Sequence, residues 1–399
     1  MKKILSVFFI CIVAIFTVYF LRNSNLDFKI DLDIFKNIAA GFNKEKFEYT
    51  NDFKVNKLQM KQADYYFKKL TASQKQIYSS LAKAINKLDS KVEVLNYNSE
   101  ETLDTTKDVS VAMDAFFADH PEVFYLKFEY TIISKKNIIK DALVIEVQYT
   151  ELDKSKISNK INELDSMITS FSSEFKNYDI FEKELKLHDK LAKEAKYYEY
   201  VNASDIPQVA HTSYGALINK SAVCDGLTKA MQLLLDRVGM ESILVSGVSN
   251  SEPHAWNMVN LDNEWYHMDI TSNKFIKNDQ GKTSNVVHSY FNITEEQILS
   301  SHKINNQDII PKANSNKYNY YVNTSSHISS VNDFTAKLKE IVKNQESSGI
   351  LEFSTDKFTN VPDKMSKVLY DINFNNIVKN KKIKLDYYNI LNTYILIKN

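Results

Sequence analysis

A crowding of scarce residue types between Gly215 and Asp269 constrains this chain more than any other feature. The chain of 399 residues has only 7 glycines, 2 cysteines and 2 tryptophans. Four of the glycines, both tryptophans and Cys224 fall within this window. Glycine is needed where the backbone takes a positive φ or approaches another group closely. A chain that has little glycine and concentrates it here is therefore predicted to hold a constrained site here.

The first part of this window has a helical pattern that places a cysteine near a helix start. Apolar residues recur with a helical period from Leu227 to Val238, and Gly239 is typical of the position just after a helix end. Cys224 would then lie in the first turn, where unpaired N–H groups and the helix dipole stabilise a thiolate. A buried structural cysteine is the alternative, because free cysteine is among the most buried residue types.

Three strands are predicted after this helix, the first at 242–248. The next two, at 254–260 and 265–270, form an antiparallel hairpin in our interpretation. With a connection of two or four residues, His254 and Asp269 share one face as diagonal neighbours, close enough for a hydrogen bond. A connection of three residues would place Asp269 on the opposite face.

Cys224, His254 and Asp269 together supply the parts of a thiol acyl-transfer site. The thiol is the nucleophile, the imidazole takes its proton, and the carboxylate holds the imidazole in the right tautomer and orientation. The N–H groups at the helix start could bind the oxyanion of a tetrahedral intermediate. The separations of 30 and 15 residues are by themselves a weak signal, because many chains contain such a triple.

Three sequence blocks around these residues resemble the transglutaminase-like superfamily, a group of papain-related cysteine enzymes. They are Tyr214–Gly226 (YGALINKSAVCDG), His254–Asn257 (HAWN) and Trp265–Asp269 (WYHMD). The resemblance covers roughly residues 180–300. It implies an α+β fold with a papain/transglutaminase-like core, in which the nucleophile lies at a helix N-terminus packed on an antiparallel sheet. It also implies that Cys224 is the nucleophile, His254 the general base and acid, and Asp269 its orienting partner.

The sequence departs from the family pattern at two places. Leu227 and Thr228 replace the usual aromatic and small residue, and residues 271–273 read Thr-Ser-Asn where many relatives have Thr-Trp-Asp. Neither change removes a member of the triad, but the second can alter the floor of the cleft and thus the choice of substrate. Trp256, on the face of His254, and Tyr214 are the predicted substrate-binding residues.

A zinc site is the alternative interpretation, because zinc is bound by cysteine, histidine and aspartate side chains. The candidate ligands are Cys224, His254, His267 and Asp269. No close ligand pair such as C-x-x-C is present, so we predict no metal and no cofactor. An Asp-rich loop with calcium-ligand spacing is also missing from the sequence. We expect His267 to be a partly exposed strand residue and His211 a loop residue.

The N-terminus carries an uncharged run of 18 residues, Ile4–Leu21, between two lysines and Arg22. A helix of this length just spans a bilayer. The bulky end of the run argues against a cleaved signal peptide, so we expect an uncleaved anchor with Cys11 as apolar filler. The lysines favour a cytoplasmic N-terminus with the rest of the chain outside, which predicts a single-pass protein of the cell membrane.

The remaining chain is predicted to divide into a linker, a core and two flanking regions. The expected limits are 1–22 for the anchor, 23–56 for the linker, 57–175 for an N-terminal α+β region, 176–320 for the catalytic domain, and 321–399 for a small α/β appendage. Helices are expected from about 70 to 88 and at 109–117, 156–172, 180–200, 331–344 and 362–379. Further strands are expected at 127–133, 142–150, 349–354 and 383–397.

Charge and composition limit the classes of partner that the chain is expected to bind. Lys and Arg (50) balance Asp and Glu (50), and the pI near 7.1 gives no basic field for nucleic acid. We expect a peptide or protein substrate at the cell envelope, and the membrane as partner of the N-terminal helix. Two functions stay open at this point: an exported cysteine acyl transferase or hydrolase, and a catalytically silent scaffold with the same fold.

Overall fold

The computed structural model describes residues 64–94, 97, 104–135, 142–273, 276–277, 283–328, 330, 333, 336, 350–355, 385–391 and 393–398. The predicted anchor and linker lie outside these residues. So do the predicted helix at 362–379 and most of the one at 331–344. Within the described residues, no helix combines the length and the apolar character that crossing a membrane requires.

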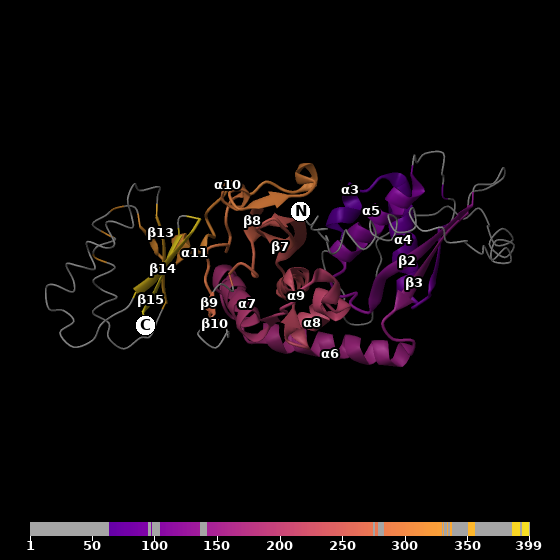
Figure 1. Cartoon of the computed structure of the whole chain (residues 1–399), viewed down its shortest axis with the longest axis horizontal. Coiled ribbons are helices and arrows are strands. Elements are labelled where there is room, and N and C mark those ends of the chain that lie inside the picture. The colour runs from indigo at the N-terminus through magenta and orange to yellow at the C-terminus, as the bar shows by residue number, and fades with distance from the viewer. Residues whose placement is uncertain are drawn as a thin grey trace. The chain divides into compact units, whose positions relative to one another are not determined.

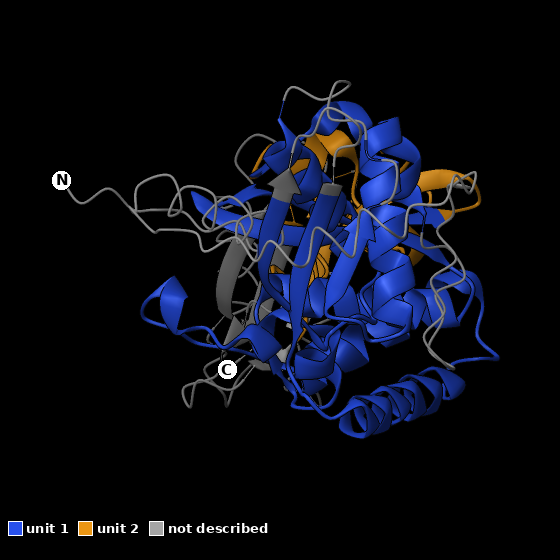
Figure 2. Ribbon diagram, turned by 90° about the vertical axis from the view of Figure 1, so that its right-hand side faces the viewer, with its two compact units in different colours: residues 1–260, 302–310 blue, residues 261–301, 311–399 orange. Residues whose placement is uncertain are grey.

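The chain divides into two compact units, which Figure 2 colours separately. The first unit comprises residues 1–260 and 302–310, and the second comprises residues 261–301 and 311–399. The first unit therefore joins the N-terminal region and the helix that begins at Cys224 in one body. The architecture is mixed α+β with mainly antiparallel sheets, as the sequence predicts.

The N-terminal part of the first unit is a helical layer packed on an antiparallel sheet of order β1-β3-β2. Helix α4 begins with a capping box in which Thr71 and Gln74 each bind the other's backbone N–H. The helix predicted at 109–117 and the strand predicted at 127–133 are confirmed with longer bounds, whereas the helix predicted at about 70–88 and the strand predicted at 142–150 are confirmed with shorter ones. Helix α3 and strand β1 were not predicted. The elements are α3 (Tyr65–Lys69), α4 (Ala72–Asn86), β1 (Lys91–Val94), α5 (Thr105–Asp119), β2 (Leu126–Lys135) and β3 (Ala142–Tyr149).

A buried carboxylate fastens the short helix α3 to this layer. Asp119 is 3% exposed and accepts the backbone N–H groups of Tyr66 at 3.0 Å and Phe67 at 2.9 Å. The Tyr66 hydroxyl in turn donates to the Leu244 carbonyl at 2.5 Å, and that of Tyr65 donates to the Ile309 carbonyl at 2.6 Å. The helix α3 thus links the N-terminal layer to the central sheet of the same unit.

Acidification from pH 7 to pH 5 is expected to stabilise this unit through Asp119. Burial raises the pKa of Asp119 to about 6, against the lowering by its two amide donors, from an ordinary value of 3.8. The folded state therefore binds the Asp119 proton more tightly than the unfolded state does. The stabilisation that results is complete below pH 3.8 and is lost as the pH rises through about 6. Urea unfolding should show a gain of about 1 kcal/mol at pH 5 over pH 7 that Asp119→Asn removes. An equal gain in that variant would contradict the assignment.

Helix α9 (Cys224–Arg237) forms the centre of the first unit. It contacts α6 (Lys154–Ser173), α7 (Ile180–Glu194), α8 (Ser213–Leu217) and β6 (Glu241–Ser249). Figure 1 shows the three helices around α9. Twelve of its residues, Asp225–Asp236, are buried. A short parallel pair leads into it, β4 (Lys196–Tyr197) beside β5 (Ser221–Ala222). The helix expected at 180–200 ends at Glu194, because residues 196–197 pair as a strand.

The sheet beside α9 has β6 between β11 (His302–Ile304) and β7 (Glu252–Leu261), with both pairs antiparallel. The β6–β7 turn consists of Asn250 and Ser251, with φ of 51° and 65°. The sequence predicts that strand β7 begins at His254, but in the structure it begins at Glu252. Positive φ at both turn residues matches the twist of a tight hairpin and lets pairing start directly after them.

The second unit begins as the chain turns out of β7 into β8 (Glu264–Met268). This turn has two residues, Asp262 and Asn263, with φ of 53° and 66°. These values fit a type I′ turn, which Asn and Asp tolerate better than most residues. The connection therefore has one of the two lengths that place His254 and Asp269 on one face in the predicted register.

The rest of the second unit contains small helices and a four-stranded sheet of order β12-β13-β15-β14, in which only β12 runs parallel to its neighbour. The strands predicted at 349–354 and 383–397 are confirmed as β13 and the β14–β15 hairpin. The elements are β9 (Ile276–Lys277), β10 (Thr283–Asn285), α10 (Glu295–Leu299), α11 (Tyr320–Asn323), β12 (His327–Ile328), β13 (Ile350–Thr355), β14 (Leu385–Ile390) and β15 (Thr393–Lys398).

Candidate active site

Cys224 is the first residue of α9, and its side chain is half-buried. The first helical hydrogen bond runs from Leu227 N–H to the Val223 carbonyl at 3.0 Å. The N–H groups of the preceding residues therefore have no acceptor within the helix. The prediction that the thiol lies in the first turn is confirmed, and the helix start offers donors beside it.

The other end of α9 also follows the sequence prediction. Gly239 has a φ of 84°, and its N–H donates to the Asp236 carbonyl at 3.0 Å. The next residue, Met240, donates to the Leu235 carbonyl at 2.9 Å. These two bonds form a Schellman motif, which explains why glycine stands here.

The other glycines of the window are explained by close backbone approach. A Cβ on Gly226 would lie 2.4 Å from the Ala210 carbonyl oxygen, and one on Gly215 would lie 2.1 Å from that of Val209. A Cβ on Gly247 would lie 2.1 Å from the Lys303 carbonyl oxygen. Among the described glycines only Gly239 has a positive φ. The crowding of glycine therefore reflects close backbone packing around α8, α9 and β6.

A buried ionic cluster lies next to Cys224 in the first turns of α9. His211 Nδ1 is 2.8 Å from Asp225 Oδ1, and Lys229 Nζ donates to the His211 carbonyl at 2.6 Å. Burial alone would raise the pKa of Asp225, but the charges of His211 and Lys229 outweigh it and hold the pKa below its usual value. The expectation that His211 is a loop residue is wrong: it closes a short 3-10 helix and is 1% exposed. This cluster fixes the first turn of α9.

Thr228 links α9 to β7, the strand that carries His254. Its hydroxyl is 2.8 Å from the Cys224 carbonyl and 3.0 Å from the Ala255 carbonyl, next to His254. In return, the Asn257 amide donates to the Thr228 carbonyl at 3.1 Å. The residue that departs from the family pattern at this position therefore holds α9 and β7 in register.

His254 is half-buried in β7 and packs against two aromatic rings. Its ring centroid is 6.1 Å from that of Trp256, stacked, and 5.4 Å from that of His302 in β11. The Trp256 and His302 rings are 5.0 Å apart, edge to face. Trp256 is fully buried, so its indole supports the imidazole and offers no exposed surface to a substrate. Sequence reasoning missed His302, which lies far from His254 in the chain.

Two tyrosines, Tyr197 and Tyr200, lie close to the Cys224 thiol. Tyr197 in β4 pairs with Ala222, two residues before Cys224. Burial raises the pKa of Tyr197 well above its usual range, and the charge of Cys224 raises it further. Burial and Cys224 likewise raise the pKa of Tyr200, although its hydrogen bond from Tyr197 opposes this. Tyr200 is 40% exposed, so it offers a surface near Cys224 that the sequence did not indicate.

Asp269 follows β8 in the second unit and is fully buried. Its carboxylate accepts the N–H groups of Thr271 at 3.0 Å and Ser272 at 3.1 Å, and the Ser272 hydroxyl at 2.5 Å. Asn273 then accepts the N–H of Tyr290 at 2.9 Å through its side chain. The Thr-Ser-Asn departure from the family pattern therefore orders the loop and holds this carboxylate.

Two further residues of the sequence analysis, Tyr214 and His267, have contacts that the sequence did not indicate. Tyr214, predicted to bind substrate, stacks on Phe124 with ring centroids 4.7 Å apart, and its hydroxyl donates to Glu163 of α6. These contacts hold α8 in place, and a substrate contact stays a prediction. His267, expected to be partly exposed, is fully buried, because its backbone bridges to Ile293 with two bonds of 2.9 Å.

Comparison with known proteins finds a family model that matches the central part of the chain. Residues 169–270 match the model of the transglutaminase-like superfamily, which includes cysteine-dependent enzymes. No curated protein matches the chain. Among solved structures, it resembles a TGase at 15% identity, covering 37% of this chain and 45% of that one with a TM-score of 0.26. It also resembles a protein of Cytophaga hutchinsonii provisionally named a cysteine protease, at 12% identity. That match covers 37% of this chain and 63% of the other, with a TM-score of 0.24.

The chain thus spans less than two thirds of either solved structure. The family match contains all three motif blocks from Tyr214 to Asp269. The transglutaminase-like superfamily is therefore the family to which residues 169–270 of this chain are matched, as those blocks predict.

Proposed function

We propose that this protein is an exported, membrane-anchored cysteine acyl transferase or hydrolase that acts on peptide or protein amides. One observation supports this above all. Cys224 is the first residue of α9, and one turn later Thr228 binds the Ala255 carbonyl, next to His254. A thiol at a helix start is thereby linked through a single side chain to the strand of the proposed general base.

The proposed reaction has two halves. The Cys224 sulfur attacks the amide carbonyl carbon as its proton passes to His254, and the oxyanion is bound by N–H groups at the start of α9. When the C–N bond breaks, His254 returns the proton to the leaving amine and a thioester remains. An amine acceptor or water then attacks the thioester, with His254 taking its proton, and the thiol is regenerated.

Asp269 is the proposed orienting partner of His254. The two-residue turn at Asp262 and Asn263 supports this, because it is one of the connections that give both side chains the same face in the predicted register. The carboxylate is also buried and held by Ser272. A fixed, buried acceptor suits a group that must keep an imidazole in one tautomer.

Substrate contact is proposed for Tyr200, with Tyr214 kept from the sequence prediction. Tyr200 is partly exposed, and its pKa responds to the charge of Cys224. Tyr197 lies beside it and keeps its proton, because burial raises its pKa. The Tyr197 hydroxyl donates a hydrogen bond to Tyr200 and so holds that ring beside Cys224.

The proposed location rests on the N-terminal sequence. The uncharged run Ile4–Leu21 is long enough to span a bilayer, and the lysines before it favour a cytoplasmic N-terminus. The catalytic part would then act outside the membrane, on peptide or protein of the cell envelope. The alternative is a silent scaffold of the same fold with an idle thiol, which a reactivity measurement separates.

The alkylation rate of Cys224 by iodoacetamide tests the proposal. In the full chain at pH 7, followed by peptide mass spectrometry to distinguish Cys11, we expect fast modification that His254→Ala and Asp269→Asn slow roughly ten- to thirtyfold. A free thiol with a pKa near 8.5 is only about 3% ionised at this pH, whereas a thiol paired with histidine is almost fully ionised.

The exposed His327 provides a matched control, because His327→Ala removes an imidazole from the second unit and should leave the rate unchanged. An inert Cys224, or a rate that His254→Ala does not change, would contradict the enzyme proposal and favour the scaffold.

A further inference from the structure

Tyr200 reaches the proposed nucleophile through the short parallel strand pair that precedes α9. The last bond of this pair runs from the Tyr198 N–H to the Ala222 carbonyl at 2.9 Å. Beyond that bond, Tyr200 lies two residues further along one segment and Cys224 two residues further along the other. The backbone therefore brings Tyr200 to the start of α9, and all of these residues belong to the first unit.

The neighbouring Tyr197 fixes the Tyr200 hydroxyl. Tyr197 is half-buried, and burial raises its pKa above its usual range, so it keeps its proton. Its hydroxyl donates a hydrogen bond to the Tyr200 oxygen. Tyr200 itself is partly exposed. The Tyr200 oxygen is thus held from the protein side, while the residue stays accessible to a substrate.

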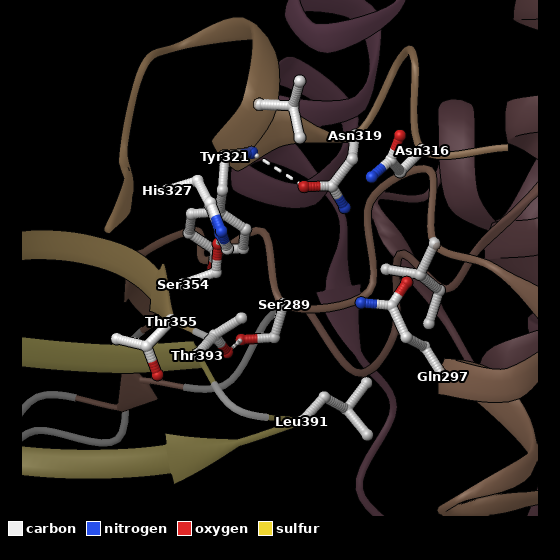
Figure 3. Close-up of a pocket in the computed structure, with 12 residues that line it drawn as sticks. Ser289, Gln297, Asn316, Asn319, Tyr321, His327, Ser354, Thr355, Leu391 and Thr393 are labelled. Carbon is white, nitrogen blue, oxygen red and sulfur yellow. Dashed lines mark hydrogen bonds between the residues drawn. The ribbon is translucent and has the colours of Figure 1, made fainter. Parts of the chain in front are cut away.

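Tyr200 differs from many tyrosines of this protein in what its hydroxyl hydrogen does. In the wall of the second unit's cavity, which Figure 3 shows, the Tyr321 hydroxyl donates to Glu352 at 3.1 Å. The hydroxyls that likewise donate to an acceptor in the chain are those of Tyr65, Tyr66, Tyr78, Tyr149, Tyr214, Tyr266, Tyr290 and Tyr318. Tyr200 accepts the hydrogen of Tyr197, and its own hydrogen has no acceptor among the residues that the structure describes. That hydrogen is therefore left for a bound molecule.

The Tyr200 hydroxyl lies near the starts of both α9 and β7. Burial raises the pKa of Tyr200, and the charges of Cys224 and Glu252 raise it further, against the lowering by the hydrogen bond from Tyr197. Glu252 is the first residue of β7 and lies two residues before His254. Because its pKa is raised, the hydroxyl stays protonated and keeps its hydrogen for donation.

Other polar side chains around Cys224 are already engaged. The Thr228 hydroxyl is shared between two backbone carbonyls, and the Asn257 amide donates to the Thr228 carbonyl. His254 has the separate task of moving the proton in the proposed reaction. Tyr200 therefore has what these groups lack, which is a hydrogen available to a negative charge that develops beside the thiol.

We propose that Tyr200 is a catalytic residue whose hydroxyl binds the oxyanion together with the N–H groups at the start of α9. As the Cys224 sulfur attacks the carbonyl carbon, one electron pair of the C=O bond moves to the oxygen, which accepts a hydrogen bond from Tyr200. The tyrosine keeps its proton. When the C–N bond breaks, that pair returns to the carbonyl, and the amine leaves with the proton from His254. Tyr197 is the positioning residue of Tyr200.

This role rests on the proposed function, because an oxyanion forms only if Cys224 attacks a carbonyl group. Oxyanion donors act where charge develops in the transition state, and one such donor contributes about 10²- to 10³-fold to kcat. A residue that merely touches the substrate would instead change KM. Alkylation of the thiol by iodoacetamide displaces iodide and forms no oxyanion, so it reports on the thiolate alone.

Tyr200→Phe tests this role in the full chain. For amine incorporation into dimethylcasein, or its cleavage, we expect kcat to fall about 10²- to 10³-fold and KM to change less than about twofold. The alkylation rate of Cys224 should stay at the wild-type value. Tyr197→Phe should lower kcat about five- to tenfold, because Tyr200 then keeps its hydroxyl but loses the hydrogen bond that holds it.

N-acetylglycinal gives a second readout that needs no turnover. Its carbonyl carbon bonds to the Cys224 sulfur while the thiol proton ends on the carbonyl oxygen, and the resulting hemithioacetal protects Cys224 from alkylation. That oxygen stands in for the oxyanion. Tyr200→Phe should raise the aldehyde concentration needed for half protection about five- to tenfold, because one hydrogen bond to the oxygen is lost.

Tyr178→Phe is the matched control, because Tyr178 is also 40% exposed and belongs to the first unit. It should behave as the wild type in all these measurements. The proposal is overturned if Tyr200→Phe leaves kcat and protection unchanged, raises KM alone, or slows alkylation as much as turnover. Slow alkylation of Cys224 in the wild type would contradict the proposed function, and this role with it.

Discussion

Replacing Cys224 by alanine is expected to lower turnover at least about 10³-fold, because the proposed thioester cannot form without the sulfur. The assay offers dimethylcasein with a fluorescent primary amine, and follows both amine incorporation and casein cleavage. The first product would indicate transfer and the second hydrolysis. The Cys224 side chain is half-buried at a helix start, so the thermal unfolding midpoint should change by only a few degrees.

Cys11→Ala is the natural control, because Cys11 is the other cysteine of the chain and lies in the predicted anchor. It should retain full activity. Activity that survives in Cys224→Ala would show that another group is the nucleophile. A wild-type protein that neither transfers nor cleaves, and whose Cys224 is also slow to alkylate, would support the scaffold alternative.

Replacing Gly226 by alanine is expected to destabilise the first unit by about 3 kcal/mol or more. The new Cβ would lie 2.4 Å from the Ala210 carbonyl oxygen and 3.0 Å from the Ala222 side chain. The carbonyl belongs to the backbone and also accepts the Val223 N–H at 3.0 Å, so it cannot move without loss. Overpacking against such a neighbour costs 1–3 kcal/mol or more. Urea unfolding measures the change.

Gly239→Ala separates this steric effect from backbone conformation. A Cβ at Gly239 would meet nothing within 4 Å, but its φ of 84° disfavours any side chain. The expected cost there is about 1–2 kcal/mol. If Gly226→Ala cost no more than this, the close approach to Ala210 would not be the reason for the glycine.

Local patterns in the sequence predicted the frame of the site well. The apolar period after Cys224 and the glycine at 239 locate both ends of α9, since each is decided by neighbouring residues. Alternation between 254 and 270 likewise predicted the two strands and permitted the turn that the structure has. Such features depend on interactions over a few residues, which a single sequence records.

The missed features depend on contacts between distant segments. His302 reaches His254 only because β11 pairs with β6, and no local pattern marks that pairing. His211 was expected in a loop because its partner Asp225 lies 14 residues away. His267 was expected to be partly exposed because its bridge partner Ile293 lies 26 residues away, which alternation within the strand cannot reveal. Tyr197 reaches Cys224 through the parallel β4–β5 pair, which has only two residues in each strand.

The return of residues 302–310 to the first unit has a consequence for the order of folding during synthesis. The ring of His302 cannot pack on His254 and Trp256 until the ribosome has added the roughly forty residues of the second unit that precede it. Helix α9 and the β6–β7 hairpin are complete well before that. A newly made chain would therefore have its nucleophile in place while one edge of the β6 strand is still uncovered. A fragment cut to the family match, 169–270, would remain permanently in that unfinished state.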